Sequence, residues 1–120
     1  MAKSVPDAVM DKILDEIATS TLQTVVSDAG TPTDLTGALA DTAMAAGDFT
    51  KALGDAGAGS RKVTMGAKSG VTVDEPGTPN HVVLSLAGTI KLVTTCTGPD
   101  VTAGSTVDFP AWKYEIGAPT

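Results

Sequence analysis

The residues with the chemistry of a nucleophile and its base are a single histidine and a single cysteine, His81 and Cys96. An imidazole beside a thiol is an arrangement that activates a cysteine nucleophile, and the two residues lie on runs that we expect to pair as strands. No Gly-x-Ser-x-Gly elbow or family-specific cysteine signature supports catalysis. We therefore interpret His81 as a structural residue at the start of a strand and Cys96 as a small hydrophobe.

Carboxylates occur in two spacings that could serve acid–base chemistry or bind a cation. Asp7, Asp11 and Asp15 recur every four residues, and Asp74 and Glu75 are adjacent. The first spacing is that of one solvated helix face, and no calcium loop of the Asp-x-Asp-x-Asp-Gly type is present. A lone cysteine cannot build a zinc site or an internal disulfide. We expect no metal, no cofactor and no catalysis.

A glycine-rich run over residues 54–60 has a composition found in loops that hold phosphate. A P-loop requires Gly-Lys-Ser/Thr at the start of a helix, whereas Ser60-Arg61-Lys62 begins a predicted strand. The strand–helix context of a dinucleotide site is missing as well. The run is therefore interpreted as a flexible connector.

Aromatic residues near the C-terminus could bind a sugar. Trp112, Tyr114 and Ile116 alternate on one face of a predicted strand, and exposed strand aromatics can form a carbohydrate platform. Phe109 lies nearby, which favours a core role for this face. A carbohydrate-binding module stays as an alternative function, to be tested by loss of glycan binding in Trp112→Ala.

The elements that would position these residues are mostly strands. Apolar residues at helical spacing predict a helix over 5–18, with a stripe that must pack on this chain's own sheet or on a neighbouring subunit. Two β-branched runs around Ala87-Gly88 predict a hairpin. The predicted strands are 21–27, 61–67, 70–74, 81–86, 89–95 and the C-terminal segment 105–116, and a short helix is expected over 35–44.

This pattern predicts a mainly β chain, an antiparallel β-sandwich or barrel-like domain with one N-terminal α-helix. We expect a single domain over residues 1–120, because the chain has 120 residues. Within it, 1–19 holds the helix, 20–60 a strand and an extended contact segment, and 61–120 the antiparallel β core. Residues 29–59 show little periodicity, which in a compact domain suggests a segment that reaches a partner.

The composition excludes several classes of function. A net charge of −6 lacks the basic footprint of a nucleic-acid binder. No apolar run reaches the roughly 20 residues of a membrane helix, and the N-terminus has no apolar signal-peptide core. We expect neither nucleic acid nor membrane as a partner, and synthesis in the cytoplasm.

Several short motifs occur in order along the chain. They are VPDAVMD at 5–11, AGDF at 46–49, SRKVT at 60–64, GTPNHVVL at 77–84 and TAGSTVDFPAWKYEI at 102–116. Together they resemble a family of small virion structural proteins of tailed bacteriophages. The resemblance spans nearly the whole chain and implies a virion component without catalytic residues.

The resemblance, with the absence of catalytic motifs, predicts a decoration or cement protein that binds the major capsid protein on the capsid surface. A tail, neck or fibre-base component is the alternative. We also expect a homo-oligomer, because an exposed helix stripe needs a partner, and deletion of residues 1–18 to abolish assembly. The predicted interface residues are Val9, Ile13, Ile17, Leu35, Leu39 and Phe49.

Overall fold

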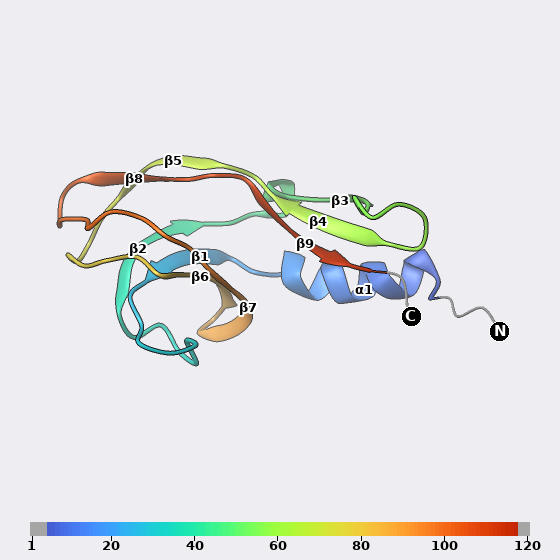
Figure 1. The fold of residues 1–120 in the computed structure, drawn as a ribbon, viewed down its shortest axis with the longest axis horizontal. Helices are drawn as coiled ribbons and strands as arrows, with labels where there is room; N and C mark the ends of the chain where they lie inside the picture. The colour runs from blue at the N-terminus through green and yellow to red at the C-terminus, as the bar shows by residue number, and fades with distance from the viewer. Residues whose placement is uncertain (1–4, 118–120) are drawn as a thin grey trace.

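Strands are the main regular structure of residues 5–117, the part of the chain that the computed structural model describes. The first four and last three residues of the predicted domain lie outside this part. The chain is mainly β, with one N-terminal helix and antiparallel pairing throughout the described sheets, as the sequence predicts. The molecule is elongated, measuring 54 × 29 × 25 Å (Figure 1).

The largest sheet has four strands in the order β2-β1-β6-β7. Its first strand, β1, pairs with β2 on one side and with the much later β6 on the other. The strands of this sheet are β1 (Leu22–Val26), β2 (Ala38–Ala43), β6 (His81–Leu86) and β7 (Thr89–Thr95).

Two smaller sheets complete the strand structure. One has the order β3-β4-β9 and the other pairs β5 with β8. A single 3-10 turn, Ala46–Asp48, leads from β2 into β3. The strands are β3 (Phe49–Leu53), β4 (Arg61–Met65), β5 (Lys68–Thr72), β8 (Thr106–Phe109) and β9 (Trp112–Ile116).

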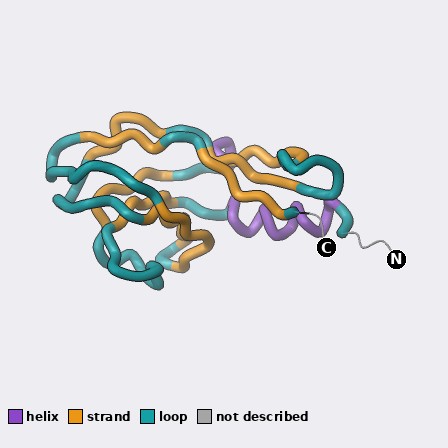
Figure 2. Tube along the Cα trace, in the orientation of Figure 1, coloured by secondary structure: helices purple, strands orange, loops and turns teal. Residues whose placement is uncertain are grey.

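The helix α1 (Asp7–Ala18) lies across the β3-β4-β9 sheet at the end of the molecule where both termini emerge (Figures 1 and 2). Pro6 precedes its first turn, where a missing N–H costs nothing, and Asp7 places a negative charge at the positive end of the helix dipole. Its buried side chains are Met10, Leu14 and Ile17. The predicted stripe therefore packs mainly on the chain's own sheet.

The buried side chains form two separate clusters. The first lies beneath α1 and joins the helix to β4 and β6; the second lies between the four-stranded sheet and the β5–β8 pair. The first contains Leu14, Ile17, Met44, Val63, Met65 and Leu84, and the second contains Val25, Leu39, Ala40, Val71, Val73 and Phe109.

The four-stranded sheet and the β5–β8 pair are the two layers of a sandwich. These layers are joined along one side and open along the other. On the joined side β2 lies against β5, and an isolated bridge connects Ala40 to Val73. On the other side β7 is the last strand of its sheet, and β8 has β5 as its only partner among the described strands. The open side between β7 and β8 contains a cavity.

The predicted hairpin is confirmed, with β6 and β7 joined by Ala87 and Gly88. Both residues have positive φ, 50° and 84°, as a two-residue type I′ turn requires. Thr94 pairs with Val82 and Thr95 with His81, so successive β7 side chains lie on opposite faces of the sheet.

The expected short helix over residues 35–44 is wrong, because β2 occupies most of it. Ala and Asp have low strand propensity, but β2 buries Leu39 and Ala40 and pairs along β1, and this tertiary setting outweighs local preference. Much of the predicted extended segment 29–59 is likewise paired as β2 and β3. The described part of the chain contains nine strands, not six.

Candidate functional site

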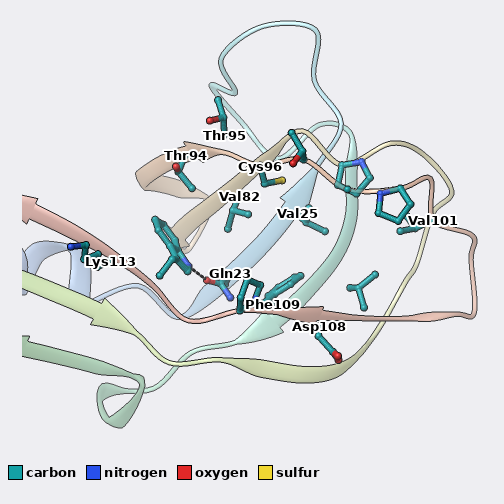
Figure 3. A pocket seen from close by; sticks show the side chains of 17 residues that line it. Gln23, Val25, Val82, Thr94, Thr95, Cys96, Val101, Asp108, Phe109 and Lys113 are labelled. Carbon is teal, nitrogen blue, oxygen red and sulfur yellow. Dashed lines mark hydrogen bonds between the residues drawn. The ribbon is translucent and has the colours of Figure 1, made fainter.

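A half-open cavity of about 580 Å³ lies on the open side of the sandwich. Its volume falls in the range of roughly 300–1,000 Å³ typical of ligand pockets. Val25 and Val82 line it from the four-stranded sheet, and Val107 and Phe109 line it from β8 (Figure 3). Further lining residues are Gln23, Pro79, the run 94–99, Val101, Asp108, Pro110, Trp112 and Lys113.

Gln23 is a fully buried polar residue in the wall of this cavity. Its Oε1 accepts a hydrogen bond of 2.7 Å from the indole Nε1 of Trp112. Its Nε2 has no hydrogen-bond partner among the described residues. A buried donor without an acceptor costs about 1–3 kcal/mol, so a polar acceptor entering the cavity would remove an existing penalty.

His81 and Cys96 do not form a nucleophile–base pair. The Nδ1 of His81 lies 2.8 Å from Oδ1 of Asn80, and the Cys96 backbone N–H donates to the Asn80 carbonyl. Cys96 is partly buried in the cavity wall, and burial raises the pKa of its thiol. A raised pKa leaves less thiolate at neutral pH, which opposes nucleophilic use.

Two of the three aspartates spaced along the helix are used in ion pairs. Asp11 accepts from both Nε and Nη2 of Arg61, at 2.9 and 3.2 Å, and Asp15 pairs with Lys51. The hydrogen bonds from Arg61 hold the pKa of the Asp11 carboxyl below its usual value. These pairs attach α1 to β3 and β4. The four-residue spacing of Asp11 and Asp15 therefore helps to hold the helix on the sheet.

The Asp11–Arg61 pair predicts a specific pH dependence. Because the folded pKa of Asp11 is depressed, its contribution to stability is present above the unfolded value, near 3.8, and is lost as pH falls through the lower folded value. Between pH 4 and 2 the melting temperature of Asp11→Asn should therefore fall less steeply than that of the wild type. Parallel melting curves across this range would contradict the assignment.

The glycine-rich run 54–60 connects β3 to β4 in a turn with its own backbone hydrogen bonds. The Gly54 N–H donates to the Ser60 carbonyl at 3.1 Å, and Gly57 has a φ of 95°. The backbone N–H groups of Asp55 and Ala56 donate to the Glu115 carboxylate at 2.8 and 3.1 Å. The position at which a phosphate loop would hold its anion is filled by the chain's own carboxylate.

The six predicted interface residues divide into three groups of two. Ile17 and Leu39 are 6% and 3% exposed, so these two side chains belong to the chain's own cores and are not available to a partner. Phe49 packs partly against the first core, and Leu35 is half-buried. Val9 and Ile13 are 50% and 51% exposed on the flank of α1.

Further exposed apolar side chains lie at the same end of the molecule. Leu53 ends β3 and is 54% exposed, and Tyr114 in the middle of β9 is 38% exposed. Both strands belong to the sheet under α1. Large apolar side chains are thus exposed to solvent on the helix itself and on two strands of the sheet beneath it.

The aromatic residues of β9 do not form an exposed platform. Trp112 is half-buried against the first core and its indole N–H is engaged by Gln23, whereas Tyr114 is exposed. A sugar-stacking surface needs both rings free, so this arrangement gives the carbohydrate alternative no further support.

Within residues 5–117, no group of three or more His, Cys, Asp or Glu side chains is placed to hold a metal ion. No helix in this range is long and apolar enough to cross a membrane. Comparisons with protein families, curated proteins and solved structures found no match for this chain.

The cavity was not predicted from the sequence. Its lining comes from β1, β6, β7, β8 and the loop after β7, and only the sheet topology brings these segments together. One local signal was present, because Gln23 and Thr24 are polar residues between the apolar Leu22 and Val25 of one predicted strand. A polar residue within a buried strand marks a place where the core must supply a hydrogen-bond partner.

Proposed function

We propose that this protein is a virion structural protein that decorates and stabilises the capsid of a tailed bacteriophage. The observation that supports the proposal most directly is the set of exposed apolar side chains at one end, Val9, Ile13, Leu53 and Tyr114. Large apolar side chains exposed at one end of a molecule favour a role in protein–protein contact. The resemblance of the sequence motifs to small phage virion proteins points to the same class.

Two of the candidate acid–base groups support this proposal, because they are engaged in structural ion pairs. Asp11 pairs with Arg61 and Asp15 pairs with Lys51. A decoration protein needs a sheet scaffold with contact surfaces and requires no activated side chain. We propose the major capsid protein as the partner and the capsid surface as the location.

Copy number in intact particles tests this function. Cryo-electron microscopy of virions should find the protein in hundreds of copies over the capsid lattice. Density confined to one vertex would move the function to a tail, neck or fibre-base component. Absence of the protein from particles would overturn the virion proposal altogether.

Self-association through the α1 end is a separate expected result. In Ile13→Asp a charge replaces a half-exposed apolar side chain that lies outside the buried core, so the fold should persist while the contact is lost. Sedimentation should show an oligomer for the wild type and a monomer for the variant. An unchanged oligomer would exclude the α1 end as the contact between copies. Thr50→Asp is the matched control, because Thr50 is an exposed residue of β3.

A further inference from the structure

The open side of the sandwich presents two strand edges to one cavity. Among the described strands, β7 pairs only with β6 and β8 only with β5. Residues 94–101 run along one side of the cavity and residues 107–113 along the other (Figure 3). Natural sheets usually protect such edges with a covering segment, a charge or a bulge. Here two edges border an apolar space.

The space between the edges has the properties of a site for an extended chain. Its walls are largely apolar, with Val25 and Val82 on one side and Val107 and Phe109 on the other. The buried Gln23 in its wall has a free Nε2 donor. A peptide carbonyl is an acceptor that would pair with this donor without bringing a charge into the cavity.

Resting on the virion function above, we propose that this cavity receives an extended segment of another virion protein, which lies between β7 and β8 and closes the open side of the sandwich. A strand edge offers backbone donors and acceptors repeated along the chain at about 3.3 Å per residue. A second extended backbone meets that spacing, which is the basis of strand addition in peptide recognition.

The charge of the molecule favours a different protein over a second copy as the donor. Each chain carries a net charge of −6, so a segment of a second copy would on average bring acidic side chains to this acidic part of the surface. Asp108 lines the cavity, and Asp100 lies between the lining residues Pro99 and Val101. Lys113, the cation of the lining, is already paired with Asp55 and Glu115. The expected segment therefore alternates apolar side chains and carries basic rather than acidic flanks.

Two substitutions on β7 test the proposal. Thr94 pairs with Val82 and lies on the cavity side of the strand (Figure 3), whereas Thr89, at the start of the same strand, is exposed and is not among the residues that line the cavity. Thr94→Trp fills the cavity without removing a core side chain, and Thr89→Trp adds the same ring outside it. Each variant is mixed with particles that lack the protein, and bound copies are counted against the wild type.

We expect occupancy of Thr94→Trp to fall at least about tenfold, equivalent to 1.4 kcal/mol of binding, while Thr89→Trp binds as the wild type does. Equal binding of all three proteins overturns the cavity proposal and leaves the decoration function intact. Failure of the wild type itself to bind overturns the decoration function and, with it, the partner proposed here. Thermal melting of each variant verifies that loss of binding is not loss of fold.

A cross-link identifies the occupant. The photoreactive residue p-benzoylphenylalanine, placed at the exposed, cavity-lining position Thr97, is irradiated in assembled particles and the product is sequenced by mass spectrometry. A product with a peptide of another virion protein supports the proposal. A product with a second copy overturns the assigned source, and no product at full occupancy overturns the presence of a segment in the cavity.

Discussion

Replacing Leu14 with alanine is expected to lower the free energy of unfolding by about 2–5 kcal/mol, the range for a buried leucine. Leu14 is fully buried in the cluster between α1 and β4. Truncation leaves a cavity at the centre of the contact that holds the only described helix on the sheet. Urea unfolding followed by circular dichroism measures the change.

Ile13 provides the matched control for this prediction, because it is adjacent in sequence and about half exposed. Ile13→Ala should change stability by no more than about 0.5 kcal/mol, as surface substitutions usually do. If both variants lost the same stability, the orientation of α1 on the sheet would be wrong.

The helix orientation also changes how the predicted deletion of residues 1–18 should be read. That deletion removes Met10, Leu14 and Ile17 from the core together with the exposed Val9 and Ile13. A loss of assembly in the truncated protein would therefore follow from unfolding as readily as from a lost contact. Single substitutions on the exposed flank separate the two effects.

Gly37→Ala is expected to destabilise the protein by about 2–5 kcal/mol, from two costs that add. Gly37 has a φ of 83°, and an L-residue in the left-handed region costs roughly 1–2 kcal/mol. An added Cβ would also collide with the carbonyl oxygen of Ser27, and such overpacking costs about 1–3 kcal/mol. The collision pushes apart the backbone where Ser27 donates to the Gly37 carbonyl at 2.9 Å.

Gly104→Ala separates the two costs. Gly104 has a φ of 85°, nearly the same as Gly37, but a Cβ there would meet nothing within 4 Å. This variant should lose only the conformational part, roughly 1–2 kcal/mol. Thermal unfolding of the two variants side by side measures the difference, and equal losses would show that the close approach between Ser27 and Gly37 is absent.

The local signals in the sequence predicted most of the C-terminal half. The β6–β7 hairpin is found as expected, because β-branched runs and a Gly turn are sufficient to specify it without distant contacts. The C-terminal strands are also found, with Pro110 marking the break between β8 and β9. In these segments local preference and final structure agree.

The central segment could not be predicted in the same way. Strand β2 has a sequence rich in Ala and polar residues, and it becomes a strand because β1 lies beside it and β5 covers it. The cavity is a product of the same long-range topology, since its walls come from strands far apart in the sequence. Local patterns in a single sequence do not indicate either the strand β2 or the cavity.

The apolar stripe of the helix shows a third limit of prediction from the sequence. Five apolar residues at helical spacing cover a sector wider than one contact can bury, and the pattern does not show which of them meet the chain's own sheet. The ion pairs of Asp11 and Asp15 with β4 and β3 settle the rotation of the helix. They leave Val9 and Ile13 on the opposite flank.

The order of strands in the sheets has a consequence for how the chain reaches its native state. The early strand β1 pairs with β6, and β4 pairs with the last strand, β9. Each core therefore contains residues from both halves of the chain, such as Leu14 with Leu84 and Val25 with Phe109. During synthesis neither core can close until the C-terminal strands have left the ribosome. Folding dominated by such distant pairings is slow, on the order of milliseconds to seconds, and the growing chain keeps its apolar strands uncovered for that time.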